Sequence, residues 1–250
     1  MSILLILCPI IAIGAIVDAI AGGGGLITLT AYVAVGLPPQ IALGNNKFAA
    51  AGGTTIACYR YIRKAQVDWK VGTIAILFSL AGSALGSSLA TRYADAYLHY
   101  LLIFLVPAIA LFIMLKPDFG QAKAMEEKYS IPLSAVAGLL LGAYDGFFGP
   151  GTGMFLTLIF TSIIGLDLLK SCGTAKVVNL ASNVAALVTF IRFGNIDYAI
   201  AIPCAISAVI GGYIGSGLAI RGGVKVIRPV MLLVLGLLLV KVAFSTFGLF

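Results

Sequence analysis

Long runs of residues without any charge constrain this chain more than any other feature of its sequence. Residues 74–90, 101–115 and 231–240 contain no Lys, Arg, Asp or Glu. A helix that crosses a bilayer needs about 20 mostly apolar residues. Only 10% of all residues are charged, whereas soluble domains carry about 25%. We therefore predict an all-α polytopic protein of the cell membrane.

The chain contains two copies of one pattern. The stretch GAIVDAIAGGGG at 14–25 corresponds to GAYDGFFGPGTG at 142–153, which aligns Asp18 with Asp145. Beyond two extra residues in the second copy, a constant spacing of 129 residues aligns Lys47 with Lys176. A repeated pattern of this length indicates two structural repeats. We expect them over residues 1–115 and 131–250, joined by a polar linker at 116–130.

Each copy contains five apolar segments, which we expect to be helical. They cover 3–20, 26–36, 40–62, 70–91 and 96–115 in the first copy, and 131–145, 152–164, 168–191, 197–219 and 226–248 in the second. The second segment of each copy would reach only about 18 Å across a hydrocarbon core roughly 30 Å thick. The first two segments of each copy therefore either span separately or form a re-entrant hairpin.

The basic residues of the loops favour one orientation of the two copies. If each copy crosses an odd number of times, 11 loop Lys and Arg residues lie on one side of the membrane and 2 on the other; an even number divides them 8 to 5. Cytoplasmic loops carry the excess of Lys and Arg. We therefore expect inverted-topology repeats, a cytoplasmic linker and both termini outside the cytoplasm.

The glycine motifs should break the helices in which they occur, since glycine in a helix interior costs about 1 kcal/mol relative to alanine. Broken helices at a repeat interface indicate the binding site of a transporter. New helix amino-termini near Leu26 and Gly153 would favour an anion. We expect six residues of these motifs to contribute to binding: Gly23, Gly24, Gly25, Gly151, Thr152 and Gly153.

Two lysines, Lys47 and Lys176, lie inside predicted membrane helices. An ionisable group near the bilayer centre costs at least about 2.5 kcal/mol. We expect both to face an anionic substrate; alternatively, each neutralises the aspartate of its own copy or reaches the membrane surface. The same helices provide amides that could bind the substrate, at Asn45, Asn46, Asn179 and Asn183.

The aspartates beside the glycine motifs have two interpretations. Asp18 and Asp145 could carry protons or gate the site, or they could cap a helix or pair with the lysines. The four cysteines are scattered without the spacing of metal ligands. We expect no metal and no cofactor.

The chain resembles the sulfite exporter TauE/SafE family of bacterial and archaeal membrane proteins. The resemblance rests on DAIAGGGGL, ALGNNKFAAAGGT, YDGFFGPGTG and AKVVNLASN. It implies a secondary transporter of small sulfur-containing anions, such as sulfite and sulfonates, in the cytoplasmic membrane, for which we expect proton coupling. The expected partners are the anion and the lipid bilayer, and a homodimer is left open. Nucleic acid is not expected, because the basic residues are dispersed over short loops.

Two other functions fit part of the sequence. An anion channel of the same architecture is one. An intramembrane aspartyl protease is the other, because Tyr144 and Asp145 resemble its first motif and Asp18 could supply a second carboxylate. The Gly-x-Gly-Asp motif of those enzymes does not occur around Asp18, and a protease would not need the two lysines. We therefore expect that the protein is not an enzyme.

Overall fold

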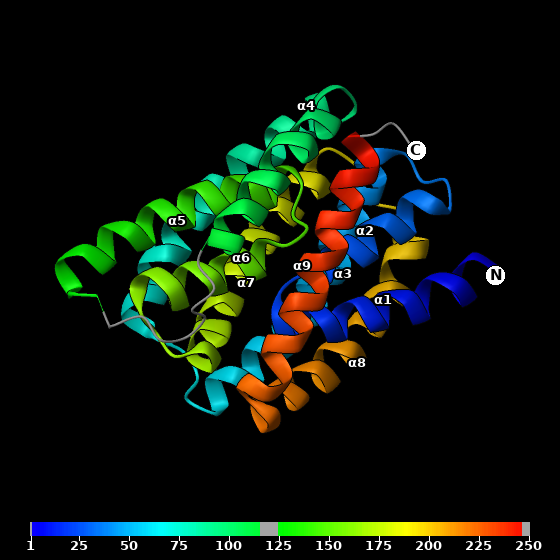
Figure 1. Cartoon of the computed structure of the whole chain (residues 1–250). Helices are drawn as coiled ribbons and strands as arrows, with labels where there is room; N and C mark the ends of the chain where they lie inside the picture. The colour runs from blue at the N-terminus through cyan, green and yellow to red at the C-terminus, as the bar shows by residue number, and fades with distance from the viewer. Residues whose placement is uncertain (1, 116–124, 247–250) are drawn as a thin grey trace.

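A computed structural model describes residues 2–115 and 125–246, with side chains over 3–92 and 125–237. This part of the chain is helical and contains no strand (Figure 1). Its elements are α1 (Ser2–Ala21), α2 (Gly25–Ala34), α3 (Pro39–Arg63), α4 (Trp69–Leu115), α5 (Glu127–Phe147), α6 (Thr152–Ile159), the π-helical η1 (Phe160–Ile164), α7 (Leu168–Arg192), α8 (Tyr198–Gly222) and α9 (Val224–Thr246). The all-α prediction is confirmed. Residues 116–124 of the predicted linker lie outside the described residues, and its last four residues belong to α5.

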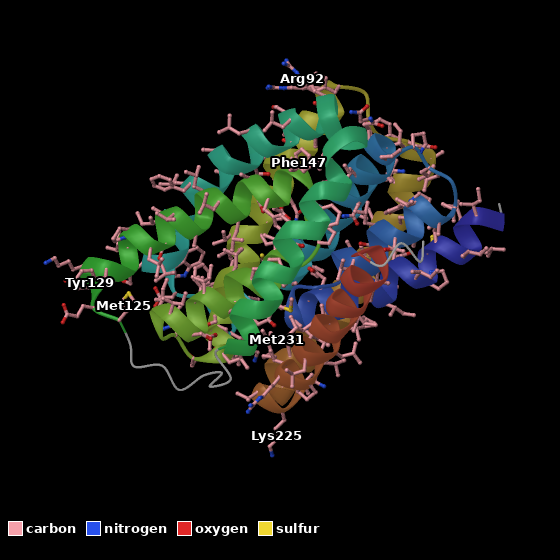
Figure 2. The ribbon with its side chains drawn as sticks, turned by 45° about the horizontal axis from the view of Figure 1, so that its top comes forward. Arg92, Met125, Tyr129, Phe147, Lys225 and Met231 are labelled. Atoms are coloured by element: carbon pink, nitrogen blue, oxygen red, sulfur yellow. The ribbon has the colours of Figure 1, made fainter. Side chains whose placement is uncertain are left out.

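The helix α4 replaces two of the predicted segments, 70–91 and 96–115. It has 47 residues, and a straight helix of that length would extend about 70 Å, more than twice the hydrocarbon thickness. The ribbon of α4 instead turns back near Arg92 (Figure 2). The two predicted segments therefore correspond to two arms of one bent helix.

Among the described residues, five helical stretches are long and apolar enough to cross a membrane. They are Ile3–Ala21, Trp69–Arg92, Glu127–Phe147, Leu168–Arg192 and Tyr198–Gly222. The stretches Gly25–Ala34 and Thr152–Ile164 are shorter, and at 1.5 Å per residue they reach only about 15–20 Å. The chain is therefore a multi-pass membrane protein in which α2 and α6–η1 cannot cross the bilayer by themselves.

The segment from α5 to η1 enters and leaves the bundle at the same end. The N–H of Met125, just before α5, donates to the carbonyl oxygen of Ile164 at 2.9 Å. Between these points α5 stops at Phe147, which lies between Arg92 at one end of the molecule and Tyr129 at the other (Figure 2). The first two apolar segments of the second copy thus form a hairpin whose two ends lie side by side.

The two copies interleave through glycine-mediated helix contacts. Gly82 and Gly86 of α4 face the backbone of α5, and Gly211 and Gly215 of α8 face the backbone of α1. A methyl group at any of these four positions would collide with a carbonyl oxygen of the facing helix. Small residues allow such close approach in membranes. The α4 and α8 helices, which occupy equivalent places in the repeat, each pack against the first helix of the other copy.

A second pair of equivalent contacts joins the loops. The Asn45 side-chain oxygen accepts a hydrogen bond from the Asp197 N–H at 2.9 Å, and the Thr174 hydroxyl accepts one from the Asp68 N–H at 2.9 Å. Asp68 and Asp197 in turn cap the amino-termini of α4 and α8 with their carboxylates. The start of each lysine-bearing helix, α3 or α7, therefore holds a loop of the other copy.

Candidate functional site

The two glycine breaks cross each other inside the bundle. Gly22 ends α1 with a φ of 81°, and Gly151 precedes α6 with a φ of 89°, conformations that glycine adopts readily. The Met154 N–H donates to the Gly22 carbonyl oxygen at 3.2 Å. A β-carbon at Gly22 would collide with the backbone of Gly153 and Met154. The glycines therefore let two backbones touch, a role that the expectation of anion-binding N–H groups did not include.

Lys47 lies beside this crossing and is fully enclosed. Its Nζ is 2.9 Å from Asp145 Oδ2, and both side chains are 2% exposed. The Lys47 Nζ donates a hydrogen bond to Asn183 Oδ1 at 3.1 Å. Its contact with Asp145 Oδ2 is an ion pair by distance, and this oxygen accepts no hydrogen bond within the described residues. Lys47 is thus neutralised by an aspartate and bonded to an asparagine, both from the second copy.

Lys176 of the second copy forms the equivalent pair with an aspartate of the first copy. Its Nζ donates to Asp18 Oδ2 at 2.7 Å, with Lys176 2% exposed and Asp18 24% exposed. The lysines do pair with the aspartates, but the alternative in which each pairs within its own copy is wrong. The first helix of each copy meets the lysine-bearing helix of the other, so charge is balanced only when both copies are present.

A small cavity of ≈ 40 Å³ adjoins both aspartates. Its polar lining combines the ion-pair residues with amides and hydroxyls, whereas small side chains form much of the remaining wall. Nine of the sequence-predicted site residues line it: Asp18, Gly24, Gly25, Asn46, Lys47, Asp145, Gly153, Asn179 and Asn183. The structure therefore brings most of the predicted site together at one place.

Five predicted residues do not line the cavity. Lys176 contacts Asp18, which does. Gly23 packs against Val234 of α9, and Asn45 accepts a hydrogen bond from the N–H of Asp197, the residue that caps α8. The Thr152 hydroxyl donates to the Gly149 carbonyl oxygen at 2.8 Å, and Gly151 is the residue before α6.

Several lining residues were absent from the predicted set. Gly22 and Gly149 line the cavity, although only their neighbours were predicted to do so. Thr28 also lines it, and its hydroxyl donates a hydrogen bond to Asn46 Oδ1 at 2.6 Å. Thr54 also lines the cavity. A sequence signal existed for Thr54, because it follows Lys47 by seven residues and so lies on the same face of α3.

One helix end still offers a backbone donor to the cavity. In the first turn of α6, the Met154 N–H is occupied by Gly22, and the Thr152 N–H donates to Gly149. The Gly153 N–H has no acceptor within the described residues, and Gly153 lines the cavity. This donor is available to an anion, as expected for the amino-terminus of a helix.

The electrostatic surroundings of the aspartates do not suit an aspartyl protease. A protease dyad needs two carboxylates that share a site and a proton. Here Asp18 pairs with Lys176 and Asp145 pairs with Lys47. Each carboxylate has its own cation, so the arrangement is two neutral ion pairs and not a dyad.

The comparisons with known proteins show the family of the chain. The family model described as Sulfite exporter TauE/SafE matches residues 7–242. The chain belongs to this family. Among its relatives, the probable membrane transporter protein YfcA of Escherichia coli K12 is 34% identical over 93% of this chain and 86% of the relative. The probable membrane transporter protein ORF9 of Sinorhizobium sp is 36% identical over 89% of this chain and 85% of the relative.

A Haemophilus influenzae relative, also described as a probable membrane transporter protein, is 32% identical over 93% of this chain and 91% of its own length. No solved structure matches the chain. As a member of the TauE/SafE family with relatives of this description, the chain is assigned to the membrane transporters.

Proposed function

We propose that this protein is a secondary transporter that moves small sulfur-containing anions, such as sulfite or sulfonates, across the cytoplasmic membrane together with protons. The observation that carries the proposal is the pair of buried Lys–Asp contacts beside a cavity, where two broken helices cross. Broken helices at a repeat interface are typical of transporter binding sites. The choice of sulfur anions rests on membership of the sulfite exporter family.

The charges of the site explain why an anion would bind there with a proton. An anion leaving water needs its charge matched, and the lysines are the cations beside the cavity. Each lysine is already neutralised by an aspartate. If the anion took the lysine alone, an unpaired buried carboxylate would remain, which is strongly unfavourable. A proton on that carboxylate removes the penalty, so anion and proton enter together.

Inverted-topology repeats with both termini outside the cytoplasm also belong to the proposal. The start of α4 lies beside the start of α5, because Lys70 and Glu127 form an ion pair with 3.0 Å between Nζ and Oε2. Tyr129 and Lys225 lie along this end of the molecule, whereas Arg92 lies at the opposite end (Figure 2). The loops of this end carry most of the basic residues, which supports its assignment to the cytoplasm.

The test is transport by the purified protein in liposomes under an imposed pH gradient at zero membrane potential. We expect saturable uphill accumulation of sulfite or a short alkyl sulfonate towards the alkaline side. Empty liposomes and the Lys47→Gln/Lys176→Gln double variant are the controls. Flux that is only downhill and does not saturate would indicate the anion channel instead. Accumulation of small carboxylates without any sulfur anion would refute the substrate class.

A further inference from the structure

The two Lys–Asp pairs differ, although they occupy equivalent places in the two copies. Lys47 has two partners, Asp145 and Asn183; all three residues line the cavity, and the Lys47 and Asp145 side chains are only 2% exposed. Lys176 has Asp18 as its partner, and Asp18 lines the cavity and is 24% exposed. The Lys47 ammonium is therefore satisfied by two groups of the protein, whereas the Lys176–Asp18 pair is open to the cavity through the more exposed Asp18 carboxylate.

The reason for the difference lies in one pair of equivalent positions. The spacing of 129 residues that separates Lys47 from Lys176 also separates Thr54 from Asn183. Asn183 carries the amide oxygen that accepts the hydrogen bond from Lys47. The position of the first copy that is equivalent to Asn183 carries the shorter side chain of Thr54. One copy thus fills this position with an amide, and the other leaves room.

The Thr54 hydroxyl is an unsatisfied group directed into the site. Thr54 is 2% exposed and lines the cavity. Its Oγ1 has no hydrogen-bond partner within the described residues. Buried polar groups are nearly always paired, and each unpaired one needs an explanation. A substrate oxygen that arrives in the cavity would provide the missing acceptor.

We propose that the substrate anion binds at the Lys176–Asp18 pair, with one oxygen accepting a hydrogen bond from the Thr54 hydroxyl, and that Asp18 takes up the coupling proton. This inference rests on the proposed function and assigns unequal roles to the two copies. The Lys176 ammonium keeps its protons and exchanges the Asp18 carboxylate for the anion. The displaced carboxylate binds one proton from solution. The Lys47–Asp145 pair remains intact and acts as a structural element.

The groups around Asp18 support this assignment of the proton. Lys176 of α7 contacts it directly, and Lys47, Cys58 and Tyr61 of α3 interact with it electrostatically. The charge of Lys47 is already balanced by Asp145. Once Asp18 is protonated, Lys176 is the remaining uncompensated cation of the two pairs, and the anion restores neutrality.

The Thr54 contact is tested by measuring sulfite and alkyl sulfonate affinity calorimetrically at one fixed pH for Thr54→Val and Thr54→Ser. We expect Thr54→Val to bind about tenfold more weakly or worse, the effect of losing a hydrogen bond to a charged group. Thr54→Ser should bind nearly as well as the wild type. The melting temperature of Thr54→Val should not fall, because the hydroxyl has no partner in the free protein. Unchanged affinity in Thr54→Val would refute the contact.

The proton assignment is tested by comparing Asp18→Asn with Asp145→Asn. Asp18→Asn should retain anion exchange, lose uphill transport and lose the pH dependence of affinity, whereas Asp145→Asn should keep that dependence. If Asp145→Asn does not fold, the Lys47→Met/Asp145→Leu double variant takes its place in the binding measurement. If the wild type transports the anion uphill but only the Asp145 variant loses the pH dependence of anion affinity, this inference is refuted. The proposed function would then still stand. Absence of wild-type sulfur-anion transport would refute the proposed function itself.

Discussion

Lys47 of α3 and Asp145 of α5 form an ion pair 2.9 Å long between Nζ and Oδ2, although they come from different copies of the duplicated sequence. Asp18 and Lys176 form the reciprocal pair. Because an uncompensated charge inside a membrane protein is costly, neither copy can bury its lysine alone. The two copies should therefore fold as one unit and not as two domains.

Replacing one residue of the Lys47–Asp145 pair should destabilise the protein more than replacing both. Lys47→Met leaves Asp145 as a buried charge without its cation, which typically costs about 3–5 kcal/mol. The Lys47→Met/Asp145→Leu double variant removes both charges and should recover most of that loss. Thermal unfolding of the purified proteins in detergent measures both effects. Equal melting temperatures for the single and double variants would contradict the ion pair.

Alanine at Gly22 should disrupt the crossing of the two glycine breaks. Gly22→Ala combines a strained φ of 81° with a collision against the Gly153 backbone. Gly36 is the matched control, since its φ is 86° and a β-carbon there meets nothing within 4 Å. We expect Gly36→Ala to cost about 1–2 kcal/mol and Gly22→Ala at least about 1–3 kcal/mol more. Similar unfolding temperatures for Gly22→Ala and Gly36→Ala would show that backbone strain alone, without the collision, explains the need for glycine at position 22.

Adjacent asparagines of α3 should respond differently to alanine. Asn45 accepts the Asp197 N–H, so Asn45→Ala should lower stability by about 1 kcal/mol without changing anion affinity. Asn46 lines the cavity, so Asn46→Ala should weaken anion binding. Calorimetric titration with sulfite, together with thermal unfolding, separates the two effects. Weaker binding in Asn45→Ala would restore the substrate role that the sequence suggested for it.

Anion affinity should fall as the pH rises. Under the proposed function, the carboxylate that the anion displaces from its lysine binds one proton, so binding of the anion takes up one proton. Mass action then weakens binding about tenfold per pH unit over the range in which this proton is taken up. Titrations in buffers of different ionisation enthalpy count the protons directly. An affinity independent of pH, with no proton uptake, would argue against coupling at either aspartate.

The orientation in the membrane can be tested with single cysteines in a background where Cys8 is replaced by alanine. Cys58, Cys172 and Cys204 are buried and should stay unlabelled. A membrane-impermeant maleimide added to intact cells should label Arg192→Cys and should not label Lys225→Cys. Labelling of Lys225→Cys but not of Arg192→Cys would contradict the inverted repeats. Labelling of both positions would contradict a crossing of the membrane by α8.

Most of the architecture could be predicted from the sequence because it follows from local properties of the chain. Apolar run length located nearly every helix, and Pro39 begins α3 as expected for proline in a first helical turn. Two short segments were recognised as unable to cross the bilayer. Buried lysines and aspartates were identified as site residues, because a charge inside a membrane segment is too costly to be incidental.

Only the tertiary structure decided which residues meet. Helical periodicity places Lys47 and Thr54 on one face of α3, but it does not say which helix of the other copy packs against that face. The interleaving of the two copies therefore decides the partner of each lysine. Asn45 holds Asp197, the N-cap residue of α8, while its neighbour Asn46 lines the cavity. The glycines break the helices, as their low helix propensity dictates. Their need for close backbone contact is visible only where Gly22 and Gly153 touch, because that steric limit depends on two segments far apart in the sequence.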